Sequence, residues 1–163
     1  MLNEYLTYGL LCALAIALIF AAFTDLRSRK ISNRLNLVIA IGAPLFWLAS
    51  GKSLYPDIVL QLGLALGVFA VLAGLFAIGA MGGGDVKLLT ALALWVDPGM
   101  FLKLVIIMAL VGGLLTVVMG AIHVMRRRKD RLAIPYGVAI ACGGLWVLGT
   151  EYLSQAPAMA GLG

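Results

Sequence analysis

The chain has 163 residues, of which 63% are hydrophobic and 12% are charged, and its mean hydropathy is +1.09. A soluble globule of this size must cover itself with polar groups, so the composition excludes a water-soluble enzyme and indicates an integral membrane protein. The net charge of +5 comes from basic residues in the breaks between apolar runs, which favours loops anchored at anionic lipid over nucleic-acid binding.

The apolar runs predict membrane helices, since about 20 residues cross the hydrocarbon core. We expect helices at 5–24, 35–50, 57–80, 86–97, 100–125 and 132–153. The fourth run is short: its eleven residues from Val86 to Val96 rise about 16 Å. It therefore begins in the preceding glycine run, tilts into thin bilayer, or dips without spanning. The predicted fold is an all-α polytopic membrane bundle of about six transmembrane helices, forming one integral membrane domain over residues 1–163.

Lysine and arginine predict the orientation, because they collect in cytoplasmic loops. With the N-terminus outside, ten of the twelve basic residues fall inside, and only Lys52 and Lys103 fall outside. The ten are Arg27, Arg29, Lys30, Arg34, Lys87, Arg126, Arg127, Arg128, Lys129 and Arg131. The segment 1–24 carries Glu4 and no basic residue, so we expect it to remain as a signal-anchor helix.

Glycines predict how the helices pack. Gly63 and Gly67 form a GxxxG pair in the third apolar run, and Gly112 lies in the fifth. The absence of a side chain lets two helix backbones approach closely, so we interpret these glycines as packing positions of a compact bundle.

Cysteine and histidine show no metal-ligand pattern. Cys12 and Cys142 lie in apolar runs without CxxC or Cys/His spacing, so we expect neither a zinc site nor a disulfide and interpret both as small buried hydrophobes. His123 stands alone before a basic run, which is typical of an interfacial or packed histidine. We expect no metal and no other cofactor.

Two of the seven acidic residues stand apart from the others. Four fall at the outer ends of predicted helices: Glu4, Asp57, Asp97 and Glu151. Asp130 lies within a run of basic residues and is explained as their solvated partner. This leaves Asp25 and Asp85, which fall at the inner ends of the first and fourth helices. Ionisable residues of membrane helices default to a functional hypothesis.

Two carboxylates at equal depth can share one proton and activate a water, which is the chemistry of an intramembrane aspartic protease. The run Gly82–Gly84 before Asp85 lets an extended chain approach closely. Each acid also has an ordinary interpretation: a helix cap for Asp85, and an interfacial partner of Arg27 or Arg29 for Asp25. The residues alone leave a peptidase dyad, a small proton- or cation-coupled transporter subunit and a non-catalytic scaffold open.

Three segments resemble one family. Residues 24–33, TDLRSRKISN, resemble the first aspartate motif of type IV prepilin peptidases, and residues 82–88, GGGDVKL, resemble their GxGD motif. Ile134-Pro135-Tyr136-Gly137 resembles their final segment. The two aspartates lie about the expected sixty residues apart in the sequence.

The resemblance implies a multi-pass aspartic endopeptidase of the inner (cytoplasmic) membrane, which removes the basic leader of prepilins or pseudopilins at the cytoplasmic face. It implies Asp25 and Asp85 as the catalytic pair, Gly82 and Gly84 as fixed motif positions along the substrate approach, and Lys87 as the lysine that follows. The expected partners are a prepilin with a transmembrane helix and a basic leader, and membrane lipid; nucleic acid is not expected.

The chain departs from the family pattern in two ways. Ile31-Ser32-Asn33 stands where the family often has Ile-Pro-Asn, which relaxes a rigid turn. The chain also lacks the cytosolic insertion with paired CxxC motifs that accompanies N-methyltransferase activity in long members. It is therefore similar to the short, peptidase-only type associated with Flp/Tad pilus systems. Archaeal preflagellin peptidases remain a similar alternative.

Overall fold

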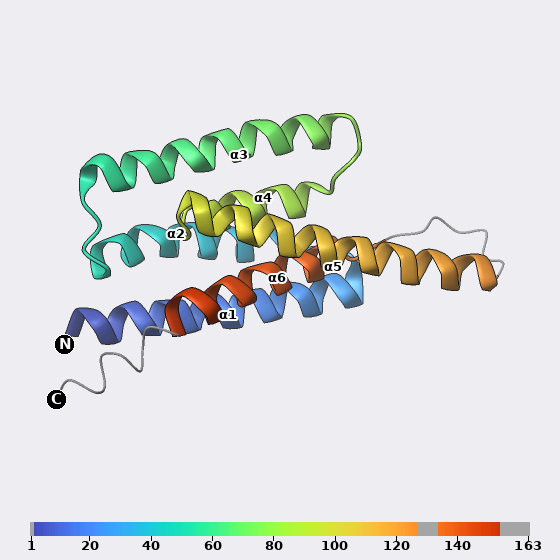
Figure 1. Cartoon of the computed structure of the whole chain (residues 1–163), viewed down its shortest axis with the longest axis horizontal. Coiled ribbons are helices and arrows are strands. Elements are labelled where there is room, and N and C mark those ends of the chain that lie inside the picture. Colours follow the sequence, from blue (N-terminus) through green and yellow to red (C-terminus); the bar gives the residue numbers. More distant parts are fainter. Residues whose placement is uncertain (1, 127–133, 154–163) are drawn as a thin grey trace.

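The computed structural model describes residues 2–126 and 134–153, and all regular elements within these residues are helical (Figure 1). In chain order they are α1 (Leu2–Ser28), α2 (Asn33–Ala49), η1 (Leu54–Ile58), α3 (Val59–Ala77), α4 (Gly83–Ala93), α5 (Pro98–Met125), α6 (Tyr136–Val147) and η2 (Leu148–Leu153). The two η segments are short π-helical turns that extend α3 and α6. The predicted all-α helical bundle is confirmed.

The two shortest α-helices occupy the centre of the bundle. Helix α6 packs against α1, α5 and α4, and α4 packs against α2, α3 and α6. Six of the eleven residues of α4 and seven of the twelve residues of α6 are buried. The long helices α1, α3 and α5 lie around them. The C-terminal part of α5 extends beyond the ends of the other helices (Figure 1). More than half of each of the two short central helices is thus enclosed by the other helices.

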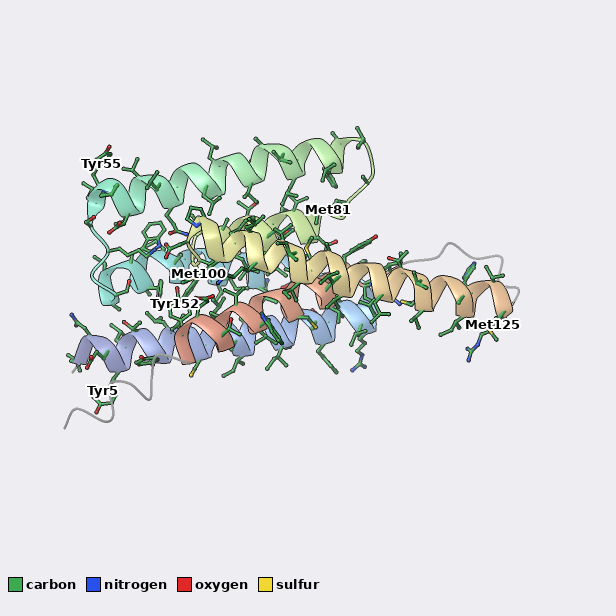
Figure 2. All side chains as sticks on the ribbon, in the orientation of Figure 1. Tyr5, Tyr55, Met81, Met100, Met125 and Tyr152 are labelled. Atoms are coloured by element: carbon green, nitrogen blue, oxygen red, sulfur yellow. The ribbon has the colours of Figure 1, made fainter. Side chains whose placement is uncertain are left out.

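The long outer helices present apolar side chains to their surroundings. Three spans, Leu2–Ser28, Leu54–Ala77 and Pro98–Met125, are long and apolar enough to cross a membrane, and only 22%, 11% and 6% of their most apolar windows are buried. Figure 2 shows these side chains projecting outward along the full length of the helices. Exposed apolar surface of this extent indicates contact with lipid rather than water.

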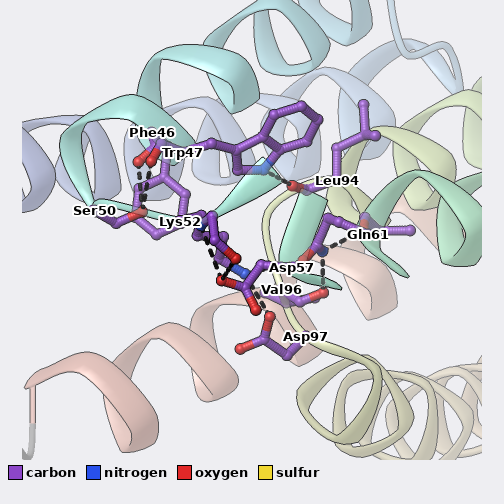
Figure 3. A network of polar contacts seen from close by, with 11 residues as sticks. Phe46, Trp47, Ser50, Lys52, Asp57, Gln61, Leu94, Val96 and Asp97 are labelled. Atoms are coloured by element: carbon purple, nitrogen blue, oxygen red, sulfur yellow. Dashed lines mark hydrogen bonds and ion pairs between the residues drawn. The ribbon is translucent and has the colours of Figure 1, made fainter. Parts of the chain in front are cut away.

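Helix α4 ends inside the bundle because side chains from other helices satisfy its last carbonyls. The final carbonyls of a helix have no partner within the helix, and at membrane depth no water supplies one. Gln61 Nε2 of α3 donates to the carbonyls of Ala93 and Val96 at 2.7 and 2.5 Å, and Trp47 Nε1 of α2 donates to the carbonyl of Leu94 at 2.8 Å (Figure 3). The carbonyls of Leu94 and Val96, in the irregular segment after α4, are therefore satisfied within the protein.

Lys52 extends this network toward the α2–α3 and α4–α5 connections. These connections lie at the end of the bundle away from the α1–α2 connection, and we call it the opposite end. Its ammonium donates to Gln61 Oε1 at 3.0 Å and forms an ion pair with Asp97 (Figure 3). Lys103 forms an ion pair with Glu151. The two basic residues that the sequence places outside thus each have an acidic partner in the structure.

We expect Gln61→Leu to lower the thermal stability of the detergent-solubilised protein by about 5 °C or more, because it leaves buried carbonyls without donors. Gln61 is 1% exposed, so water cannot replace the lost bonds. Leu66→Ala on the same helix removes a side chain that is 70% exposed and serves as the control. An unfolding temperature of Gln61→Leu equal to that of the control would contradict this role.

The helix boundaries differ from the prediction where tertiary contacts decide them. Helix α1 continues past residue 24 to Ser28, and Arg29 then takes a left-handed conformation (φ 55°) that ends it. Helix α4 covers 83–93 rather than 86–97, because its glycines are helical and the network around Gln61 ends it early. Helix α6 begins at Tyr136, after a proline. The predicted basic run at 127–131, with Asp130, lies outside the described residues.

Two packing predictions are wrong. A Cβ added to Gly63 or Gly67 would meet no atom within 4 Å, so this GxxxG pair makes no close contact within the described chain. The close approach occurs instead at Gly143, where a Cβ would lie 2.6 Å from the carbonyl oxygen of Leu104. The two cysteines are exposed rather than buried, since both lie on outward helix faces. The packing role predicted for Gly112 holds, because a Cβ there would lie 3.5 Å from Ala139.

Candidate active site

Asp25 belongs to the buried face of α1. The buried residues of this helix recur at the spacing of one helix face and are Leu11, Leu14, Leu18, Ala21 and Asp25. Asp25 is 6% exposed, so the helix directs this carboxylate into the protein in its last turns. Helix α1 continues for three residues beyond Asp25, so this carboxylate lies near the end of the helix, as predicted, but is buried in the protein.

Helix α6 supplies the hydrogen-bond donor to Asp25. The backbone N–H of Gly137, in the first turn of α6, donates to Asp25 Oδ2 at 2.8 Å. A Cβ at Gly137 would lie 2.9 Å from that oxygen and 2.8 Å from Ile31 Cδ1. Only glycine gives the carboxylate this access to the helix N-terminus, where free N–H groups favour negative charge.

Asp85 lies in the first turn of α4, as its third residue. The N-cap of α4 is Gly82, so the interpretation of Asp85 as the helix cap is wrong. A Cβ at Gly82 would lie 2.8 Å from Asp85 Oδ2, and a Cβ at Gly84 would lie 3.3 Å from Ile31 Cβ. The glycines therefore leave room for the carboxylate on one side and let α4 pack against the α1–α2 connection on the other.

The structure brings the predicted aspartates together in one cavity of about 670 Å³. Asp25, Asp85, Gly82 and Gly84 all line it. Helix α4, with 11 residues, is too short to cross the hydrocarbon core by itself, and Asp85 lies in its first turn. Burial, and after it the negative charge of Asp25, raise the pKa of Asp85 to about 6. A carboxyl with this pKa exchanges its proton near neutral pH.

Lys87 does not line this cavity. Its ammonium donates to Asn33 Oδ1 at 2.8 Å, and both residues line a neighbouring groove between α2 and α4. Asn36 Nδ2 donates to the carbonyl of Gly84 at 3.2 Å. Lys87 and the two asparagines therefore attach the start of α4 to the start of α2, which holds the glycine run beside the cavity.

Sequence reasoning missed three residues that hold the site: Asn33, Asn36 and Gly137. The two asparagines are three residues apart at the start of an apolar helix, a spacing that places them on one face and was a usable signal. Gly137 stands in the segment that resembles the family's last one, but its role had no signal in the sequence, because its contact with Asp25 joins residues 112 positions apart. Ser32, which replaces the proline of the family pattern, is the N-cap of α2, and its hydroxyl accepts from the N–H of Leu35 at 3.2 Å.

The family model described as "Type IV leader peptidase family" matches residues 12–118. The chain belongs to this family. The match covers both aspartates and ends within α5, so α6 and its donor Gly137 lie beyond it. No curated protein and no solved structure matches the chain. As a member of a leader peptidase family it is a peptidase, and the family implies a prepilin as its substrate.

Proposed function

We propose that this protein is a membrane aspartic endopeptidase that removes the basic leader from prepilins of the Flp type. One observation carries the proposal: carboxylates from two different helices, Asp25 of α1 and Asp85 of α4, line the same cavity. Together with membership of the leader peptidase family, this makes the pair the candidate catalytic groups. The chemistry that the pair can perform needs only the two carboxyl groups and a water molecule.

The proposed mechanism uses one proton shared by the two carboxyl groups. The ionised carboxylate takes a proton from water as the water oxygen attacks the scissile carbonyl carbon, and the protonated carboxyl donates to the carbonyl oxygen. Collapse of the tetrahedral intermediate breaks the C–N bond, and a proton passes to the leaving amine. Because the pair titrates as a unit, the acid and the base are roles of the pair rather than of either residue.

The proposed orientation places the cavity at the cytoplasmic face of the inner membrane, with the N-terminus outside. The turn that joins α1 to α2, beside the cavity, carries Arg29 and Lys30. Basic residues collect on the cytoplasmic side of membrane proteins, whereas Lys52 and Lys103 at the opposite end have acidic partners. The proposal includes a multi-pass chain, and peptidase activity without N-methyltransferase activity.

The position of the acids argues against a transporter subunit. A proton or cation pathway places its carboxylates near mid-membrane. Asp25 instead lies in the last turns of a 27-residue helix, and Asp85 lies in the first turn of α4. An archaeal preflagellin-type substrate stays open as the second candidate within the same chemistry.

The test is co-expression of the protein with candidate Flp-type prepilins and, in parallel, with preflagellins. We expect a gel shift of the Flp-type prepilin, loss of the leader by N-terminal sequencing, and an unmethylated new N-terminus by mass spectrometry. Cleavage of preflagellins alone would reject the Flp-type assignment. No cleavage of either class by protein that is inserted in the membrane would reject the proposed peptidase.

We expect the pH profile to report the shared proton. A raised pKa means that the shared proton is held below that pKa and lost as the pH rises through it, so kcat/KM should be highest just below about pH 6 and fall about tenfold per pH unit above it. The measurement is cleavage by the detergent-solubilised enzyme across this range. A rate that rises with pH across the same range would contradict the shared-proton mechanism.

A further inference from the structure

An apolar groove of about 320 Å³ runs along the outside of the bundle between α1 and α2. Helix α1 contributes small side chains to it, including Ala13 and Ala17, and α2 contributes larger ones, including Val38 and Leu45. Within the described part of the chain, no charged residue lines it. The groove therefore matches an apolar partner rather than a polar ligand.

Trp95 and Gly42 shape the floor of the groove. The indole N–H of Trp95 donates to the carbonyl of Ile39 at 2.8 Å, so its polar atom is satisfied and the ring presents apolar surface. A Cβ at Gly42 would lie 2.7 Å from the ring, so this glycine is what allows the ring to lie against α2. The floor is therefore held by contacts within the protein before any partner binds.

The groove leads toward the cavity that holds the aspartates. Along α1, the groove residue Ala17 is followed by Phe20, Thr24 and Ser28 at the spacing of one helix face, and these three residues line the cavity. The apolar groove covers Leu10 to Ala17, about 10.5 Å along this face, and the cavity residues continue the face to Ser28, about 16.5 Å further. One face of α1 thus connects the apolar groove to the cavity that holds the carboxylates.

We propose that the α1–α2 groove binds the transmembrane helix of the substrate and directs the end of that helix into the aspartate cavity. The inference rests on the proposed function, and it names the surface on which the proposed peptidase holds its substrate. In lipid, helices associate through close packing, which small residues such as Ala13 and Ala17 permit. The neighbouring groove between α2 and α4 is a poorer match, because a helix there would cover the charged, exposed Lys87.

Site-specific photo-crosslinking tests the location. The probe is a prepilin that the wild-type enzyme cleaves, trapped with the Asp85→Asn variant carrying benzoylphenylalanine at one position. The positions are Ile41 in the α1–α2 groove, Phe69 in the α2–α4 groove and Leu66 on the exposed face of α3. We expect an adduct from Ile41 only. Adducts from Phe69 or Leu66 in place of Ile41, or no adduct from Ile41, would overturn the proposal.

A pair of tryptophan substitutions tests the role of the groove in catalysis. Ala13→Trp fills the groove, whereas Ile16→Trp adds bulk to a residue of α1 that is 67% exposed and does not line it. We expect kcat/KM for the prepilin to fall about tenfold in Ala13→Trp and to stay within about twofold in Ile16→Trp. Equal rates in the two variants would overturn the proposal and assign the groove to lipid or to no partner. Since the probe is cleaved by the wild type, such a failure leaves the proposed function intact.

Discussion

Asp25→Asn and Asp85→Asn are each expected to lower prepilin cleavage by about 10³-fold or more while the protein remains inserted in the membrane. Asparagine has nearly the shape of aspartate but can neither hold nor release the proton that the mechanism moves. Both side chains line the same cavity, so either change should remove the pair rather than half of it. The measurement is the fraction of co-expressed prepilin processed at matched membrane levels of enzyme.

The double variant and a distant control sharpen this test. If the two groups act as a unit, Asp25→Asn combined with Asp85→Asn should be about as inactive as either single variant. Asp57→Asn is the control, because Asp57 lies at the opposite end and accepts hydrogen bonds from Ser53, which asparagine can accept too. Wild-type processing by either single variant would reject the dyad.

Gly137→Ala is expected to lower kcat/KM by about 10-fold to 100-fold by displacing Asp25, for which Gly137 is a positioning residue. The added methyl group would lie 2.9 Å from Asp25 Oδ2, shorter than a van der Waals contact. The hydrogen bond from the Gly137 N–H to this oxygen, now 2.8 Å long, must then lengthen or break. Because the charge of Asp25 raises the pKa of Asp85, moving Asp25 should also shift the alkaline limb of the pH profile.

Two other glycines separate positioning from folding. Gly143→Ala places a methyl group 2.6 Å from the carbonyl oxygen of Leu104, away from the aspartates, so it should lower stability without shifting the pH profile. Gly113→Ala meets no atom within 4 Å and should match the wild type in both respects. A Gly137→Ala enzyme with the wild-type rate and pH profile would show that the N–H of α6 does not position Asp25.

The sequence predicted the architecture well because hydrophobic runs of membrane length are a strong signal. It also predicted that Asp25 and Asp85 belong to one end of the bundle, because each follows or precedes an apolar run beside basic residues. It gave 86 as the start of α4 and the glycine run as an alternative start, and the structure confirms the alternative, because tertiary packing overrides the low helix propensity of glycine here. Gln61 was a missed signal, because a polar residue inside an apolar run needs a partner, and it binds the end of α4.

The contact between α1 and α6 was beyond the sequence for a different reason. The donor Gly137 and the acceptor Asp25 come from the first and last α-helices described, and their approach depends on how α4 and α6 fill the centre of the bundle. Hydrophobic periodicity predicts which face of each helix is buried but not which two helices meet. The resemblance of residues 134–137 to the family's final segment marked this turn without indicating its role.

The attachment of α4 at both of its ends gives this helix a fixed length. Its first turn is bonded to α2 through Asn36, and its last carbonyls are bonded to Gln61 and Trp47. One inserted residue between these attachments would move Asp85 by about 1.5 Å along the axis and about 100° around it relative to the far attachment. Members of the family that preserve this arrangement should therefore differ in the identity of the residues along α4 but not in their number. The C-terminal part of α5, which extends beyond the other helices, is free to differ in length (Figure 1).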